Sequence, residues 1–332
     1  MGERKDTMKV GMISFAHGHA HSYARALKAL DGVILAGIAD PDPERGQKCA
    51  QMYDTTYYAD IHDLLATDIE AVVIASENAL HHEHVIAAAQ AGKHILCEKP
   101  LAVNSALAQE MIDVCADHGV ILQTAFPVRF NSPVAEAKQI VASGKLGDII
   151  GIKGTNRGTN PGGWFVKKEL SGGGAVIDHT VHVVDLMRWF TGAEVTEVYA
   201  EIGHDMINNY GIDDCGIITM QFDNGMFATL DCSWSRNPSF PTWGDVTMEI
   251  IGTEGTLSVN AFGQKVNVYN EDHGAKWHAW GDNMDLGLIE DFIDAVRHKR
   301  EPSITGLDGM RAVEVAEAAY RSAQQKAPVK LR

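Results

Sequence analysis

The sequence predicts an α/β protein in which a doubly wound parallel sheet is followed by an α+β domain with an open, mostly antiparallel sheet. Three observations support this. Short apolar runs alternate with helical patterns in the first third of the chain, strand patterns dominate after about residue 147, and 332 residues are too many for one ordinary compact domain. We therefore predict two domains, residues 1–126 and residues 127–332.

The predicted elements of the first domain alternate between strand and helix. Strand patterns cover residues 9–14, 33–39, 71–75, 94–97 and 120–124, and helical patterns cover residues 20–30, 43–52, 60–65, 81–91 and 105–118. This order predicts βαβ units with right-handed crossovers, so the carboxyl ends of the strands share one edge of the sheet. Open α/β sheets bind their ligands at that edge.

The second domain carries mostly strand patterns, at residues 149–156, 195–203, 215–222, 226–234, 246–251, 256–260 and 266–269. Asn224-Gly225 is a strong hairpin signal. Helical patterns cover residues 174–190, 286–298 and 307–324. We expect the last helix and Leu331 to pack back near the domain junction, and the exposed face of the large sheet to mediate oligomerisation.

The composition is that of an acidic globular protein. Its 28 basic and 44 acidic residues give a formal net charge of −16, which argues against nucleic acid or anionic membrane as a partner because both require a basic surface. The apolar stretch 10–15 is too short for a signal core or a membrane span. Five scattered cysteines without CxxC spacing favour reduced thiols in a cytoplasmic protein over disulfides or structural zinc.

A lysine stands at the end of the strand pattern 94–97, in the sequence Cys97-Glu98-Lys99-Pro100. Pro100 disfavours helical geometry at Lys99, so the lysine is expected in an extended turn at the ligand-binding edge. The alternative is that Glu98 and Lys99 form an ordinary surface ion pair.

The first turn has the strand–turn–helix context of a dinucleotide-binding fingerprint. Ser14, Ala16 and His19 stand at its three glycine positions. Small residues at the first two still permit the backbone to approach a pyrophosphate at the helix N-terminus. His19 weakens the argument for close packing of the helix on the strand.

Two further strand ends carry polar residues. Asp40 lies 26 residues after Ser14, where an acid binds ribose hydroxyls and repels a 2′-phosphate, which favours NAD over NADP; the alternative is plain turn chemistry. Ser76 and Asn78 follow the strand pattern 71–75. They are candidates for hydrogen bonds to the cofactor, for capping the next helix, or for both.

A third candidate lies on the helix predicted at 174–190. Helical spacing places Asp178, His182 and Asp185 on one stripe, which suits a general acid/base whose ring is oriented by an acid. The alternative is a histidine salt-bridged on a helix surface. The helix is apolar nearly all round, however, and burying unpaired charges costs several kcal/mol.

In this order, the motifs resemble the Gfo/Idh/MocA family of sugar and polyol oxidoreductases over essentially the whole chain. The resemblance is carried by the first turn, Ser76-Glu77-Asn78 with His81, Glu98-Lys99-Pro100, Arg129-Phe130, Gly172-Gly173-Gly174 and the Asp178–His182–Asp185 segment. Glu77 departs from the family's usual proline, and Pro127 stands where asparagine is frequent.

The resemblance implies roles for named residues. Lys99 and His182 match the family's catalytic lysine and acid/base histidine, and Asp178 matches its substrate-binding aspartate. The implied cofactor-binding residues are Ser14, Phe15, Ala16, His17, Asp40, Ser76, Asn78, His81, Glu98, Lys99 and Arg129. The implied substrate-binding residues are Lys99, Arg129, Trp164, Asp178, His179 and His182, with Trp164 stacking on a sugar face.

The expected reaction is reversible hydride transfer between a secondary alcohol of a sugar, polyol or inositol and NAD, in a homodimer or homotetramer. Two alternatives stay open: a transient-redox enzyme that eliminates or hydrolyses through a keto-sugar, and a non-catalytic NAD-binding sensor. No metal is expected, because His17 and His21 straddle a helix start and nothing in the sequence fixes the directions of their rings. His179 is one residue, about 100°, from Asp178 and is not expected to share its face.

Overall fold

The computed structural model describes residues 7–207, 209–270, 274–279 and 283–331. The chain divides into two compact units, which are described separately. The first comprises Met1–Pro127 and Asp285–Met310, and the second comprises Val128–Met284 and Arg311–Arg332. The sequence boundary at residues 126 and 127 lies one residue from this division, but the return of 285–310 to the first unit was not predicted.

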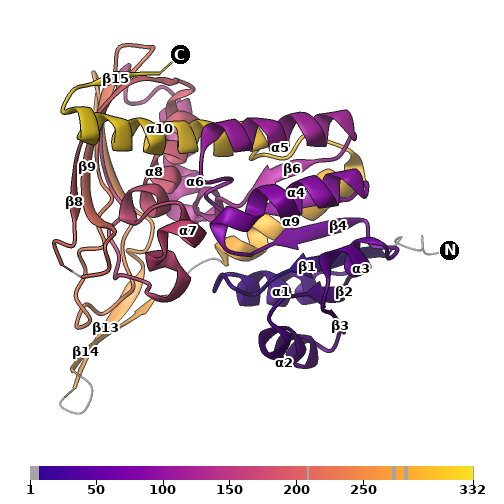
Figure 1. The fold of residues 1–332 in the computed structure, drawn as a ribbon. Coiled ribbons are helices and arrows are strands. Elements are labelled where there is room, and N and C mark those ends of the chain that lie inside the picture. Colours follow the sequence, from indigo (N-terminus) through magenta and orange to yellow (C-terminus); the bar gives the residue numbers. More distant parts are fainter. Residues whose placement is uncertain (1–6, 208, 271–273, 280–282, 332) are drawn as a thin grey trace. The chain divides into compact units, whose positions relative to one another are not determined.

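The first unit is built on a parallel sheet with strand order β3-β2-β1-β4-β5-β6 (Figure 1). The strands are β1 (Met8–Ile13), β2 (Val33–Ala39), β3 (Thr56–Tyr58), β4 (Ala71–Ile74), β5 (His94–Cys97) and β6 (Leu122–Thr124). All residues of β4 are buried, as expected for a strand covered on both faces. The order reverses at β1 and β4, the switch point where such sheets bind ligands.

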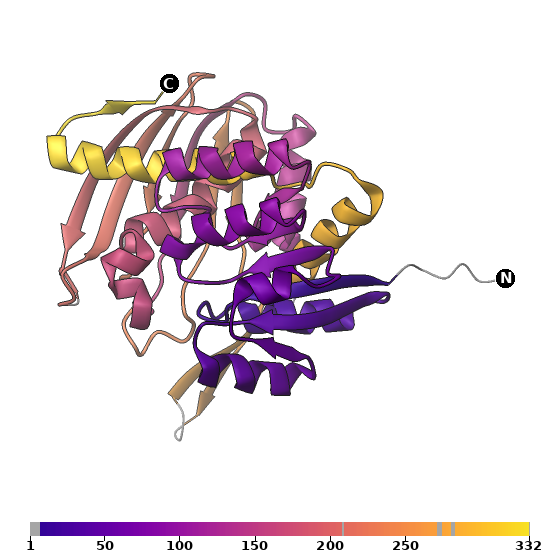
Figure 2. The ribbon, with the colours of Figure 1, turned by 45° about the vertical axis from the view of Figure 1, so that its right-hand side comes forward.

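Helices connect these strands as predicted. They are α1 (Ala20–Ala29), α2 (Pro43–Tyr53), α3 (Ile61–Leu65), α4 (His81–Gln90) and α5 (Ser105–Asp117), with the 3₁₀ helix η1 (Asn78–Leu80) before α4. The later helix α9 (Met284–His298) belongs almost entirely to the same unit. Figure 2 shows α4 and α5 side by side over one face of the sheet. The strand β3 was not predicted, because three residues are too few to show a period.

The second unit is built on a seven-stranded sheet with order β12-β11-β7-β10-β9-β8-β15. Its strands are β7 (Ile149–Thr155), β8 (Val195–His204), β9 (Asp213–Phe222), β10 (Phe227–Asp231), β11 (Thr247–Gly252), β12 (Thr256–Asn260) and β15 (Val329–Lys330). Neighbours pair antiparallel except β7 and β10. A separate hairpin pairs β13 (Lys265–Asn270) with β14 (Gly274–Ala279).

The helix α8 (Ala175–Thr191) packs on β7 and β9 of this sheet. On the face of the sheet away from α8, Tyr199, Ile217, Phe227 and Ile251 are exposed. The sequence therefore predicted this architecture correctly, including the helix at 174–190. It missed α6 (Ser132–Ala142), the four-residue α7 (Lys168–Ser171), β14 and β15.

The closing helix α10 (Gly306–Gln325) leads to β15, and the backbone N–H of Leu331 donates to Thr196 O of β8 at 2.8 Å. Leu331 thus lies beside the sheet of the second unit. Within the described chain, no helix combines the length and apolar character that crossing a bilayer requires.

Candidate active site

The first turn uses serine where the backbone favours glycine. Ser14 has φ +66°, a left-handed conformation that costs a non-glycine residue roughly 1–2 kcal/mol. The Ser14 hydroxyl accepts the N–H of Ala16 at 3.1 Å, and Asp40 Oδ2 accepts the N–H of Phe15 at 2.8 Å. Hydrogen bonds between the Ser14 and Asp40 side chains and the backbone therefore stabilise this turn, although its conformation would favour glycine at position 14.

The N-terminus of α1 fits an anionic ligand. It has no side-chain cap, and its N–H groups carry partial positive charge. A Cβ built on Gly18 would meet nothing within 4 Å, so space is open beside the helix start. Together these features suit the pyrophosphate of a dinucleotide.

Asp40 is fully buried and its carboxylate is paired with Arg45. Oδ1 accepts from Arg45 Nη2 at 2.8 Å and from the N–H of Asp42 at 2.9 Å; Oδ2 accepts from Arg45 Nε and from the N–H of Phe15, both at 2.8 Å. Four donors occupy the roughly four acceptor positions of a carboxylate. A ribose hydroxyl can reach Asp40 only by displacing a donor. The Arg45 guanidinium is the only one of these donors that belongs to a side chain, and that side chain is partly exposed. The sequence did not identify Arg45.

The residues after β4 are buried and bonded to each other. His81 lies between two backbone carbonyls, with Nδ1 2.9 Å from Pro100 O and Nε2 3.2 Å from Ser76 O. Ser76 Oγ lies 3.0 Å from Nδ1 of His84. Asn78 begins η1 and is also buried. His81 therefore joins the loop after β4 to the loop that carries Lys99.

Glu98 is the centre of a buried hydrogen-bonded cluster. Its Oε1 accepts from Tyr23 Oη at 2.6 Å and lies 2.9 Å from Nδ1 of His19 and 3.5 Å from Nδ1 of His17. Its Oε2 accepts the N–H of Lys99 at 2.9 Å. The interpretation of Glu98-Lys99 as a surface pair is wrong, because the two residues are only 1% and 5% exposed.

The charges in this cluster shift its pKa values. Burial raises the pKa of Glu98, but the His17 and His19 charges, the His19 hydrogen bond and Lys99 outweigh it and hold that pKa well below its usual value. Burial lowers the pKa of His19, but Glu98 outweighs it and leaves that pKa raised. Glu98 is therefore a carboxylate, and its fixed negative charge lies at the end of β5.

In the second unit, Asp213 and Tyr320 hold the N-terminus of α8. Asp213 accepts the N–H of Gly174 on Oδ1 at 2.8 Å and the N–H of Val176 on Oδ2 at 2.9 Å, and Tyr320 Oη donates to Oδ1 at 3.0 Å. A Cβ on Gly174 would lie 1.9 Å from Asp213 O. The glycines are thus needed for close approach, while Asp213, which supplies the cap from β9, was not identified from the sequence.

Asp178 meets an indole and an imidazole on the first turn of α8. Trp234 Nε1 donates to Asp178 Oδ2 at 3.2 Å, and His179 Nε2 lies 3.3 Å from the same oxygen. We expected His179 and Asp178 not to share a face, because neighbouring residues project about 100° apart around a helix axis. This expectation is wrong for their side-chain ends, which converge. Trp234 was not predicted.

The stripe Asp178–His182–Asp185 is on α8 as predicted, and each of its carboxylates has a partner outside the stripe. Asp185 accepts Arg129 Nε at 2.8 Å and Nη2 at 2.5 Å, in a pair that is almost completely buried. Asp178 is bonded to Trp234. His182, which lies between the two aspartates in the sequence, is half-buried. Arg129 therefore anchors α8, a contact that the sequence did not predict.

Aromatic rings surround His179. The rings of Trp243 and Trp234 are nearly perpendicular to the imidazole, at ring-centroid distances of 5.1 and 6.3 Å. A Cβ on Gly158 would lie 2.9 Å from the Trp243 ring, so glycine permits this packing. Trp164 is half-buried and stacks on Phe165 at 3.9 Å, which covers one face of its indole.

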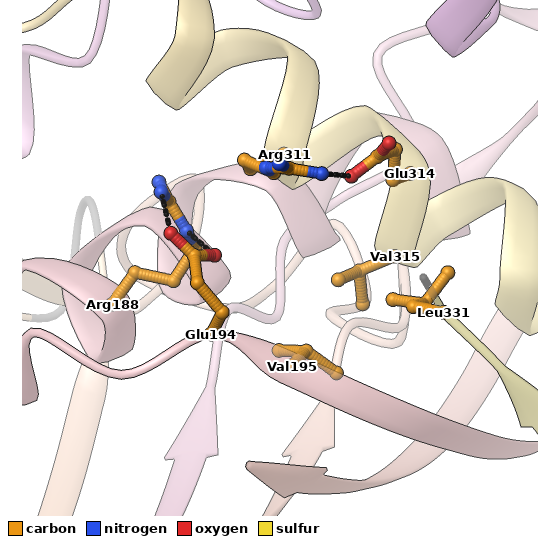
Figure 3. A pocket seen from close by; sticks show the side chains of 7 residues that line it. All are labelled: Arg188, Glu194, Val195, Arg311, Glu314, Val315 and Leu331. Atoms are coloured by element: carbon orange, nitrogen blue, oxygen red, sulfur yellow. Dashed lines mark hydrogen bonds and ion pairs between the residues drawn. The ribbon is translucent and has the colours of Figure 1, made fainter. Parts of the chain in front are cut away.

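A small pocket of about 60 Å³ lies elsewhere in the second unit, shown in Figure 3. Its charged groups pair with each other: Arg188 Nη2 with Glu194 at 2.6 Å, and Arg311 Nη1 with Glu314 at 2.8 Å. Val195, Val315 and Leu331 complete its lining. Because both guanidinium groups already have carboxylate partners, we interpret these residues as structural rather than as a binding site for an anion.

Comparison with known proteins matches both parts of the chain to one family. Residues 8–126 match the model described as "Oxidoreductase family, NAD-binding Rossmann fold", and residues 134–258 match the "GFO/IDH/MocA C-terminal domain". An uncharacterized oxidoreductase YrbE of Bacillus subtilis is 31% identical, covering 90% of this chain and 89% of its own. A myo-inositol 2-dehydrogenase of Thermotoga maritima is 29% identical, covering 98% of both chains.

A similar solved structure is that of GenD2 from gentamicin A biosynthesis in complex with NAD. It superposes with a TM-score of 0.91 at 25% sequence identity, covering 100% of this chain and 99% of its own.

Proposed function

The chain belongs to the Gfo/Idh/MocA family of NAD-binding oxidoreductases, and on that premise we propose that it transfers a hydride between a secondary alcohol of a sugar, polyol or inositol and NAD. The name of the Thermotoga maritima relative supports the substrate class. The observation that carries the proposal is the burial of Lys99 at the carboxyl end of β5, where ligands bind in such sheets: it is only 5% exposed, whereas lysine is rarely so buried unless it is paired.

The first unit binds the cofactor in this proposal. The first turn, Ser14 to His17, and the uncapped N-terminus of α1 take the pyrophosphate, and Asp40 takes the adenosine ribose after Arg45 moves aside. Ser76 and Asn78 line the neighbouring loop, while His81 fixes that loop to Pro100 O. The nicotinamide supplies the hydride acceptor when it is bound.

The protein's own groups handle the proton and the charge. His182 takes the hydroxyl proton of the substrate, and Lys99, as a cation, stabilises the developing alkoxide. The Glu98 carboxylate, bonded to the N–H of Lys99, fixes the backbone from which that side chain projects. Because a proton-accepting histidine must be neutral, the forward reaction is expected to be faster at higher pH.

The second unit holds the substrate. Asp178 accepts a sugar hydroxyl while the indole of Trp234 orients its carboxylate. His179 and Trp164 complete the sugar-binding set. Arg129 acts through Asp185 by fixing α8, so we assign it a positioning role rather than direct contact with substrate.

Two further properties complete the proposal. Five cysteines without disulfides support a cytoplasmic location. The exposed Tyr199, Ile217, Phe227 and Ile251 on one sheet face support a homodimer or homotetramer.

The test is a panel of monosaccharides, polyols and inositols with NAD and with NADP, measured by the absorbance of the reduced cofactor. The proposal expects reduced NAD to accumulate with at least one member. Substrate consumption without reduced cofactor identifies the transient-redox alternative, and tight NAD binding without any turnover identifies the sensor. Either result overturns the proposal.

A further inference from the structure

The cluster around Glu98 has the composition of a metal site. Among the residues that the structure describes, His17, His19 and Glu98 form the group of three metal-ligating side chains whose ligand atoms all lie within 4.8 Å of one another. Two imidazoles and one carboxylate are a frequent ligand set for divalent transition metals and leave coordination positions open.

From this geometry we propose that His17, His19 and Glu98 bind a divalent transition-metal ion of the zinc class. Nδ1 of His19 and Nδ1 of His17 lie 2.9 and 3.5 Å from Glu98 Oε1. Ligands bonded to one zinc ion at about 2.0–2.1 Å are about 2.9 Å apart at 90° and about 3.5 Å apart at 115°. The ion therefore fits with little movement of these atoms.

The hydrogen bonds of His17 favour a cation between the rings and the carboxylate. Nδ1 of His17 accepts the backbone N–H of His19 at 3.2 Å, so in this arrangement Nδ1 carries a lone pair and no hydrogen. That lone pair lies 3.5 Å from an oxygen of Glu98. A divalent cation that takes the place of the His19 hydrogen at this lone pair is attracted to the Glu98 oxygen as well.

The surroundings of Glu98 also suit a ligand. Tyr23 Oη donates to Oε1 and the N–H of Lys99 donates to Oε2, which fixes the orientation of the carboxylate. Hydrogen bonds of this kind typically tune metal affinity 10- to 100-fold. His17 and Glu98 are buried, while the side chain of His19 is 39% exposed, so an ion has an entry side.

The structure supplies what the sequence lacked. The spacing of His17 and His21 fixed no ring directions, and no metal was expected. In the fold the third ligand comes from the end of β5, 79 residues after His19, and His21 turns away to Tyr53, with its Nδ1 2.9 Å from Tyr53 Oη. The proposed site therefore combines two histidines of the first turn, His17 and His19, with the carboxylate of Glu98 from a distant part of the sequence.

The experiment is calorimetric titration of Zn²⁺ into the chelator-treated full chain, without nucleotide or substrate. We expect one ion per chain at this site. His17→Ala and Glu98→Gln should each weaken binding at least about 100-fold, and Tyr23→Phe about 10-fold. His21→Ala, in the same loop, is the matched control and should bind zinc as the unaltered protein does.

Absence of zinc binding, or equal binding by the variants and the control, overturns the proposal and leaves the cluster as a proton-sharing network. If a variant fails to fold by circular dichroism, zinc-edge anomalous scattering from crystals of the unaltered chain decides instead. A peak within about 2.3 Å of the three ligand atoms supports the site, and a peak only elsewhere refutes it. Neither measurement involves hydride transfer, so its result is independent of the proposed function.

Discussion

Arg129 and Asp185 form a bidentate ion pair inside the second unit, with Nε–Oδ2 and Nη2–Oδ1 distances of 2.8 and 2.5 Å. The Asp185 side chain is fully buried and that of Arg129 is 6% exposed. The pair links the 3₁₀ helix η2 (Pro127–Phe130) to α8, the helix that carries Asp178 and His182. Its integrity therefore controls where the proposed acid/base group lies.

Loss of one partner of this pair should be strongly destabilising. Arg129→Ala leaves the Asp185 carboxylate buried without its counter-ion, which typically costs about 3–5 kcal/mol of unfolding free energy. Urea denaturation monitored by tryptophan fluorescence measures the loss. The double variant Arg129→Met with Asp185→Leu should recover most of it, because an apolar pair replaces the ion pair. Equal stability of Arg129→Ala and the unaltered protein would contradict the account.

Removal of the remote cap should loosen α8 at its first turn. Asp213→Ala removes the acceptor of the Gly174 and Val176 N–H groups, and loss of such a cap costs about 1–2 kcal/mol. The Tyr320 hydroxyl also loses its acceptor. We expect faster amide hydrogen exchange at residues 174–178 than in the control Asp223→Ala, which removes a hydrogen bond to the N–H of Glu194. Unchanged exchange in that segment would refute the capping role.

Acid should destabilise the protein partly through His84. Burial, with a contribution from His81, lowers the pKa of His84 to about 4, so the unfolded chain, with a value near 6.5, binds its proton first as pH falls. Stability is fully present above pH 6.5 and declines towards pH 4, by about 3 kcal/mol from this group. Denaturation at intervals across that range should show a smaller decline for His84→Gln. An identical decline in both proteins would exclude His84 as a cause.

The Asp40–Arg45 pair should set the choice between NAD and NADP. Asp40→Ser removes the acid and releases the Arg45 guanidinium, which then has the chemistry to bind a 2′-phosphate. We expect the ratio of kcat/KM with NADP to kcat/KM with NAD to rise at least about 10-fold. Asp42→Ser is the matched control, because Asp42 caps α2 and lies 4.0 Å from Arg45. An unchanged ratio in Asp40→Ser would rule out this role.

The sequence was a good guide to what repeats along the chain. The apolar run of β2 and the helix α8 appear almost at their predicted bounds, because periodicity reports which face of an element is buried. Because β1, β2, β4 and β5 are parallel, their carboxyl ends lie at the same edge of the sheet. The positions of Ser14, Asp40, Ser76 and Lys99 at those ends were therefore predictable.

Partners that come from distant parts of the chain were not predictable. Helical spacing placed Asp185 on the stripe of His182, but it could not show that Arg129, 56 residues earlier, takes the carboxylate. The cap that Asp213 gives to α8 crosses 39 residues. The contact of Glu98 with His19 spans 79. A single sequence records the faces of elements, whereas these contacts depend on which elements pack together.

The central claim is that Lys99 and His182 carry out the proton and charge handling of hydride transfer. The most direct measurement is single-turnover formation of reduced NAD with the substrate identified from the panel, in the unaltered protein, Lys99→Ala and His182→Ala, together with NAD affinity by fluorescence titration. We predict that each variant slows turnover by about 10²–10⁴-fold while NAD affinity changes by less than about threefold. Wild-type rates in both variants would contradict the account.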